Sequence, residues 1–73
     1  MPKQLSKCKQ GVKNKVVEIG GSDDTKRFLA NIGLHEGDDI VIISKLASNY
    51  IINIKDGRFG IDEGIAKLIL VDS

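Results

Sequence analysis

The chain has 73 residues, 41% of them apolar and 29% charged, with a formal net charge of +1 at pH 7. This length favours a single domain over residues 1–73, and the composition excludes a disordered chain. The longest apolar runs, residues 40–43 and 68–71, are far too short to span a membrane. No apolar core that could serve as a signal peptide opens the chain, so we expect a cytoplasmic protein.

The N-terminal segment is strongly basic. Five lysines precede the first acidic residue, Glu18: Lys3, Lys7, Lys9, Lys13 and Lys15. Such a segment could contact anionic lipid at the inner face of a membrane, contact an acidic protein, or simply be a solvated edge. The lone Cys8 cannot form an internal disulfide, and we expect it to be a small buried apolar residue, with a lysine-activated thiol as the alternative.

Residues 16–19, Val-Val-Glu-Ile, are expected to form the first strand, which ends at a pair of glycines. A helix should follow at once. Ser22 can accept a hydrogen bond from the free amides of the first turn, and the carboxylates of Asp23 and Asp24 favour the positive end of the helix dipole. The start of the helix is therefore well specified.

The same helix is expected to stop at Gly33. A helix end commonly needs a residue in the left-handed conformation, which costs about 1 to 2 kcal/mol for a residue with a Cβ atom, and Leu34 can then fold back onto the last turn. A tight turn should follow and end at Gly37. We expect Phe28 and Ile32 to form the inward apolar face of the helix.

Apolar runs bounded by turn residues predict the remaining strands at 39–45, 50–55, 58–61 and 67–71. The dipeptide Asp56-Gly57 is a strong two-residue hairpin signal, so 50–55 should pair antiparallel with 58–61. Residues 62–66 are expected to form one helical turn. The sequence thus predicts a mostly β fold: a small barrel of about five antiparallel strands with one inserted short helix, whose closure would leave no exposed sheet edge.

Catalysis and tight metal binding are not indicated. His35 is the only histidine and lies beside Glu36, far in sequence from Cys8, whereas a nucleophile needs a base and an orienting group at hand. A tight zinc site takes four thiol or imidazole ligands, and the chain has one of each. We expect no enzymatic activity, no cofactor and no high-affinity metal site, with weak cation binding by carboxylates as the alternative.

Nucleotide and nucleic-acid binding are also disfavoured. Asp23 and Asp24 lie at the start of the helix, where a phosphate would dock, and their charge repels an anion. Small barrels that bind nucleic acid need a basic field and exposed aromatic rings. The chain has three aromatic residues, and beyond the basic segment acids outnumber bases. A nucleic-acid-binding module is therefore the alternative and an interaction module the main expectation.

The sequence resembles the ferrous iron transport protein A (FeoA) family over nearly its whole length. The matching positions are Leu5, Gly11, Val16, Ile19, Arg27, Leu29, Ile32-Gly33-Leu34, Gly37, Asp56-Gly57, Ala66, Ile69 and Val71. The resemblance implies an SH3-like barrel with an inserted helix, no enzymatic activity, and a partnership with a large membrane ferrous iron transporter that carries its own GTP-binding domain. The barrel is also similar to the C-terminal domain of iron-dependent repressors, and the chain is too short to include their DNA-binding part.

On this hypothesis the chain is an adaptor or regulatory subunit, and a standalone SH3-like regulatory or nucleic-acid-binding module is the alternative. The candidate partner contacts are Lys26, Arg27, Tyr50 and Phe59, and the structural positions are Gly33, Leu34, Gly37 and Gly57. Tyr50 and Phe59 could instead fill the barrel. Two segments depart from the family pattern: residues 46–49 replace a loop with Pro and Gly, and Ile61-Asp62 replaces a Leu-Arg pair, which removes a positive charge.

Overall fold

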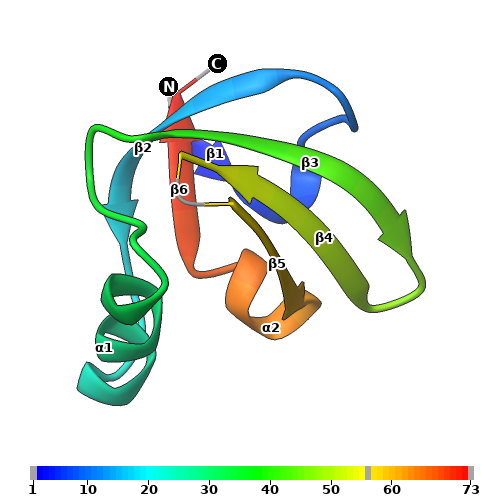
Figure 1. The fold of residues 1–73 in the computed structure, drawn as a ribbon. Helices are drawn as coiled ribbons and strands as arrows, with labels where there is room; N and C mark the ends of the chain where they lie inside the picture. The colour runs from blue at the N-terminus through cyan, green and yellow to red at the C-terminus, as the bar shows by residue number, and fades with distance from the viewer. Residues whose placement is uncertain (1, 56, 73) are drawn as a thin grey trace.

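One antiparallel sheet carries most of the chain. The computed structural model describes residues 2–55 and 57–72, and six strands within them follow the order β1-β6-β2-β3-β4-β5 (Figure 1). The elements are β1 Lys3–Gln4, the 3₁₀ helix η1 Leu5–Lys7, β2 Lys13–Ile19, α1 Asp23–Asn31, β3 Asp39–Leu46, β4 Asn49–Ile54, β5 Gly57–Asp62, α2 Glu63–Ala66 and β6 Ile69–Asp72.

The sheet curls around a single core, as Figure 1 shows. Hairpins join β3 to β4 and β4 to β5, while β6 returns to lie between β2 and β1. A β-bulge in β2 and another in β3 shift the register, and such bulges bend a strand and increase its twist. The expected mostly β architecture with one inserted short helix, α1, is therefore present.

Closure of the barrel differs from the expectation. Within the described residues, β1 and β5 stand at the two ends of the strand order and do not pair with each other. The expectation that closure leaves no free sheet edge is therefore wrong at β5, which pairs with β4 alone. β1 has only two residues, and its described pairing is with β6, so it offers little strand for β5 to pair with.

Strand boundaries agree with the sequence to within one residue except near the N-terminus and at the last strand, which was expected from residue 67 and begins at Ile69. β1 was not expected, and β2 begins at Lys13 rather than at residue 16. The inward residue of this early part of β2 is Asn14, which is 2% exposed, and its neighbours Lys13 and Lys15 face solvent. The strand alternates between its faces, but a polar residue takes the buried position, so apolar periodicity does not reveal it.

The β4–β5 hairpin confirms the predicted pairing. Its register runs from Ile54↔Gly57 to Asn49↔Asp62 without a shift. Asp56, the first residue of the predicted turn dipeptide, lies outside the described residues, and Gly57 has a φ of 133°.

The helix α1 begins and ends as the sequence predicts. Ser22 Oγ accepts a hydrogen bond from the Thr25 amide at 3.4 Å. At the other end Gly33 has a φ of 94°, its amide donates to the Ala30 carbonyl at 3.0 Å, and the Leu34 amide donates to the Leu29 carbonyl at 2.9 Å. This pair of bonds is a Schellman motif, so the helix stop at Gly33 is confirmed.

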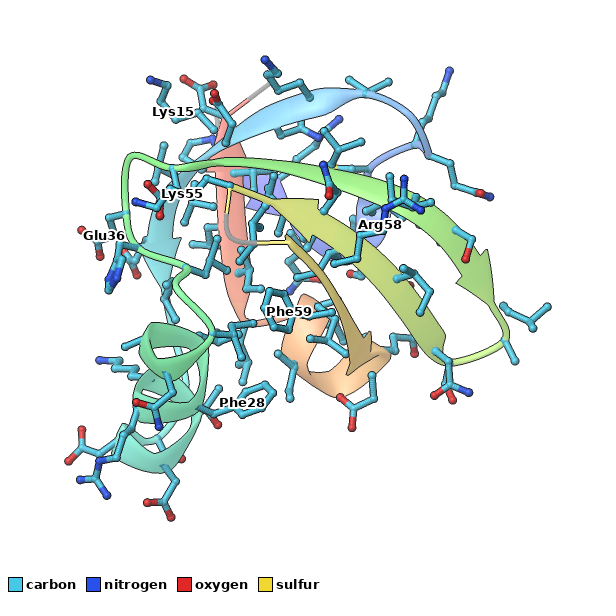
Figure 2. The ribbon with its side chains drawn as sticks, viewed as in Figure 1. Lys15, Phe28, Glu36, Lys55, Arg58 and Phe59 are labelled. Carbon is cyan, nitrogen blue, oxygen red and sulfur yellow. The ribbon has the colours of Figure 1, made fainter. Side chains whose placement is uncertain are left out.

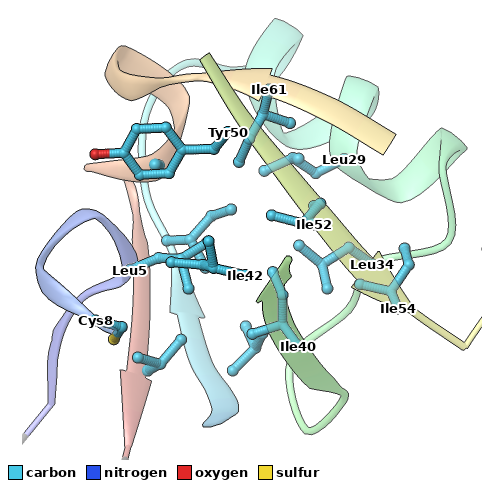
Figure 3. Close-up of a cluster of buried hydrophobic side chains, with 14 residues drawn as sticks. Leu5, Cys8, Leu29, Leu34, Ile40, Ile42, Tyr50, Ile52, Ile54 and Ile61 are labelled. Atoms are coloured by element: carbon cyan, nitrogen blue, oxygen red, sulfur yellow. The ribbon is translucent and has the colours of Figure 1, made fainter. Parts of the chain in front are cut away.

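The core draws buried apolar side chains from both helices and all of the longer strands (Figure 3). From α1 it receives Leu29, which is 0% exposed, with Ile32 packed against its margin. The expectation that Phe28 faces inward is wrong, because Phe28 is 40% exposed. Phe28 lies four residues and Leu29 three residues before Ile32, so either could share a helix face with it. The structure buries Leu29 on that face.

Candidate functional site

The four predicted contact residues lie in different environments. Lys26 and Arg27 are exposed on α1, and the Arg27 guanidinium is 3.9 Å from the Asp24 carboxylate in a solvent-exposed pair. Phe59 on β5 is half-buried and packs against the core, whereas Tyr50 on β4 is only 4% exposed. The structure therefore does not bring the four together on one surface.

Tyr50 is a core residue with a polar tip. Its hydroxyl donates to Glu63 Oε2 at 3.4 Å, and Lys45 Nζ lies 5.4 Å from the centre of its ring. Loss of hydration on burial, and then the nearby Glu63 carboxylate, raise the pKa of Tyr50 above its ordinary value. These contacts favour the alternative that Tyr50 fills the barrel and links β4 to α2.

Phe28 is the aromatic residue that α1 leaves open to a partner. In Figure 2 its ring extends from α1 toward the side of the barrel on which Phe59 lies. Lys26 lies on another side of the helix, where it lines a hollow of about 420 Å³ with residues that include His35 and Glu36. We call Arg27, Phe28 and Phe59 the α1–β5 surface.

Phe28 was not among the predicted contact residues, because the apolar pattern of the helix assigned its side chain to the core. The signal that could have found it is the competition between two adjacent apolar residues on one short helix. When Phe28 and Leu29 both match the inward stripe, a nine-residue helix can bury one of them and leaves the other exposed.

The turn after α1 is held by charge and by backbone bonds. Asp38 Oδ2 accepts a hydrogen bond from the His35 amide at 2.8 Å, and Lys55 Nζ is 3.6 Å from Asp38 Oδ1. The bond from the His35 amide and the positive charge of Lys55 lower the pKa of Asp38. Gly37, with a φ of 91°, donates its amide to the Val16 carbonyl at 2.7 Å. These contacts fix the turn that connects α1 to β3.

The basic segment forms a separate hollow of about 270 Å³. Its lining residues are Lys3, Lys7, Cys8, Lys9, Val12 and Asn14. Cys8 is 2% exposed, which confirms it as a small buried residue. Asn14 donates its side-chain amide to the Val12 carbonyl at 3.2 Å, and its Oδ1 has no hydrogen-bond partner within the described residues.

No arrangement suited to tight metal binding is found in the described part of the chain. Residues 2–55 and 57–72 contain no group of three or more His, Cys, Asp or Glu side chains that could hold a metal ion. In the same residues, no helix has the length and apolar character needed to cross a membrane.

Comparison with known proteins places these features in a family. A family model described as FeoA domain matches residues 3–73. Among solved structures, the chain is similar to an iron uptake regulatory protein (FeoA), with 30% identity, a TM-score of 0.87, and coverage of 97% of this chain and 96% of the other. No curated protein matches the chain in sequence.

Two more distant structures share the fold. One is a FeoA-like protein from Clostridium acetobutylicum, with 22% identity, a TM-score of 0.87, and coverage of 97% and 85%. The other is a manganese-dependent transcriptional repressor, with 21% identity, a TM-score of 0.88, and coverage of 99% of this chain but 41% of the repressor. The expected SH3-like fold is thereby confirmed. The matched family is a non-catalytic accessory of iron transport, which confirms that the chain is not an enzyme.

Proposed function

Because this chain belongs to the FeoA domain family, which is tied to ferrous iron uptake, we propose that it is a small cytoplasmic adaptor or regulatory subunit that binds a membrane ferrous iron transporter. The contact is with the cytoplasmic part of the transporter, which carries a GTP-binding domain. The observation that carries this proposal is the family match over residues 3–73. Binding holds the protein at the inner face of the membrane.

The α1–β5 surface is the proposed contact. Aromatic and arginine side chains dominate the binding energy of most protein interfaces, and Arg27 and Phe28 are exposed neighbours on α1. Tyr50 is too deeply buried to contribute directly, and Lys26 reaches a partner only if that partner wraps around the helix. The small area of one short helix and one strand favours a dissociation constant in the micromolar range or weaker.

Interferometry tests the proposal with two immobilised forms of the transporter: the full protein in detergent and its soluble GTP-binding domain. Phe28→Ala should weaken binding by roughly five- to thirtyfold, which corresponds to about 1 to 2 kcal/mol. Leu46→Ala is the matched control, since Leu46 is 75% exposed at the end of β3 but lies outside the α1–β5 surface. It should bind as the wild type does.

Failure of the wild-type protein to bind either form would contradict the proposal. Salt-sensitive binding to RNA or DNA in the same experiment would instead support the alternative, a nucleic-acid-binding module. Equal effects of Phe28→Ala and Leu46→Ala would leave the adaptor role in place and move the contact away from α1.

A further inference from the structure

The strand β5 is an open edge of the sheet. It pairs with β4 on one side, and no other strand lies beside it within residues 2–55 and 57–72. In the same part of the chain, Arg58 and Gly60 take part in no backbone or side-chain hydrogen bond outside the β4–β5 pairing. An edge of this kind presents free amide and carbonyl groups to a further strand.

The register identifies which groups are free. Ile54 and Gly57 close a two-residue hairpin, and such a closing pair exchanges both of its backbone hydrogen bonds. Bonded pairs alternate along an antiparallel ladder, so Phe59 and Ile61 also bond to β4. The amide and carbonyl groups of Arg58 and Gly60 therefore point away from β4, toward the open edge.

Both outward residues of β5 are open to solvent: among residues 2–55 and 57–72, Arg58 and Gly60 are both exposed. A Cβ atom built on Gly60 would lie at an ordinary 3.7 Å from Ile51 Cδ1, so alanine fits at this position. The opposite edge, β1, is protected differently, because it has only two residues and one of them is Lys3. β5 has six residues, no proline and a regular register without a bulge, so it lacks most of the devices that keep an edge from pairing.

The two faces beside the β5 edge differ in chemistry. Phe59 and Ile61 point into the barrel, and the exposed ring of Phe28 reaches toward this side from α1 (Figure 2). On the other face Arg58 is exposed and has no ion-pair partner within the described residues. A strand laid along this edge would meet an apolar surface on one face and a positive charge on the other.

We infer that an extended segment of the transporter adds to β5 as an additional strand, an inference that rests on the proposed function. The segment has apolar residues at alternate positions, which face Phe28 and Phe59, and an acidic residue on the opposite face beside Arg58. Main-chain bonds to Arg58 and Gly60 supply affinity, and the alternating side chains supply specificity.

A pair of substitutions at Gly60 separates main-chain pairing from other effects. Gly60→Pro removes the outward amide donor without removing a bond to β4, and proline is tolerated in an edge strand whose amide faces solvent. Gly60→Ala keeps that donor and is the matched control. Interferometry with the detergent-solubilised transporter should show Gly60→Pro at least tenfold weaker than the wild type, and Gly60→Ala within about twofold.

Hydrogen exchange on the wild-type protein provides a second measurement, which does not require any variant to fold. Amides of residues 57–62 should exchange several-fold more slowly in the complex than in the free protein. Normal binding by a folded Gly60→Pro variant, or no added protection of residues 57–62, would overturn the inference and leave the proposed function intact. Failure of the wild type to bind would overturn both, and a concentration-dependent dimer with the same protection would assign the edge to a second copy of this chain.

Discussion

Single residues fix the connection between α1 and β3. Gly33 supplies the left-handed conformation at the helix stop. Asp38 accepts a hydrogen bond from the His35 amide where the chain turns into β3. Leu34, between them, is 1% exposed and anchors the turn in the core. Each of these roles depends on one chemical property of the side chain, so each can be tested by one substitution.

Gly33→Val should destabilise the protein by at least about 1 to 2 kcal/mol, because a residue with a Cβ atom is strained at a φ of 94°. In a domain of this size that loss lowers the melting temperature by roughly 4 to 8 °C for each kcal/mol. Gly60→Val is the control, since Gly60 lies in a strand without a positive φ and should melt within a few degrees of the wild type. Thermal unfolding decides, and an unchanged melting temperature for Gly33→Val would contradict the role of Gly33.

Asp38 should make the stability of the protein depend on acid pH. Its pKa is lowered from the ordinary value of 3.8, first by the hydrogen bond from His35 and then by Lys55, against an opposing effect of burial. The stabilisation is therefore fully present above the unfolded pKa and is lost as pH falls through the lowered folded value. Urea midpoints measured between pH 6 and pH 2.5 should fall less for Asp38→Asn than for the wild type. Parallel curves for wild type and Asp38→Asn would refute this assignment.

The two helices differ in the contacts that hold them. Each buries one residue fully, Leu29 in α1 and Ala66 in α2, and α2 adds the hydrogen bond between Glu63 and Tyr50. Their caps also differ: Asp62 Oδ1 accepts from the Ile65 amide at 2.8 Å, and Ser22 Oγ accepts from the Thr25 amide at 3.4 Å.

Removal of the α2 cap should therefore cost more than removal of the α1 cap. Asp62→Ala is expected to lose about 1 to 2 kcal/mol of unfolding free energy, near the upper end for such caps, and Ser22→Ala about 0.5 kcal/mol. Asp62→Asn, which keeps an oxygen acceptor, should recover most of the loss. Urea unfolding measures all three, and a larger effect of Ser22→Ala than of Asp62→Ala would contradict this ranking of the two caps, which rests on their hydrogen-bond distances.

Local sequence signals made most elements predictable. The features that were not predicted depend on contacts between residues far apart in the sequence. The Asp56-Gly57 dipeptide and the stop at Gly33 predicted one hairpin and the end of α1 because turns and caps depend on a few adjacent residues. Whether Phe28 or Leu29 faces the core depends on how the helix sits on the barrel, which no local pattern encodes. β1 was not predicted for a similar reason, since its two residues form a strand only because β6 lies beside them.

At the scale of the whole molecule, the two side chains that favour soft or borderline metals, one thiol and one imidazole, lie in different environments. Cys8 is buried after η1, and His35 is exposed in the turn after α1. Neither belongs to a group of three potential ligands within residues 2–55 and 57–72. On the proposed function the chain acts by contact with protein, and we predict that it does not carry the ion.

Purified protein should accordingly bind ferrous iron only weakly, with a dissociation constant well above the micromolar range. Ferrous iron favours several nitrogen, sulfur or carboxylate ligands that converge on one point, and scattered carboxylates supply only loose, exchangeable contacts. Anaerobic calorimetric titration of the wild type, His35→Ala and Cys8→Ala should give the same weak, salt-sensitive signal for all three. A one-to-one site of micromolar or tighter affinity that disappears in either variant would instead favour an iron carrier over the adaptor role.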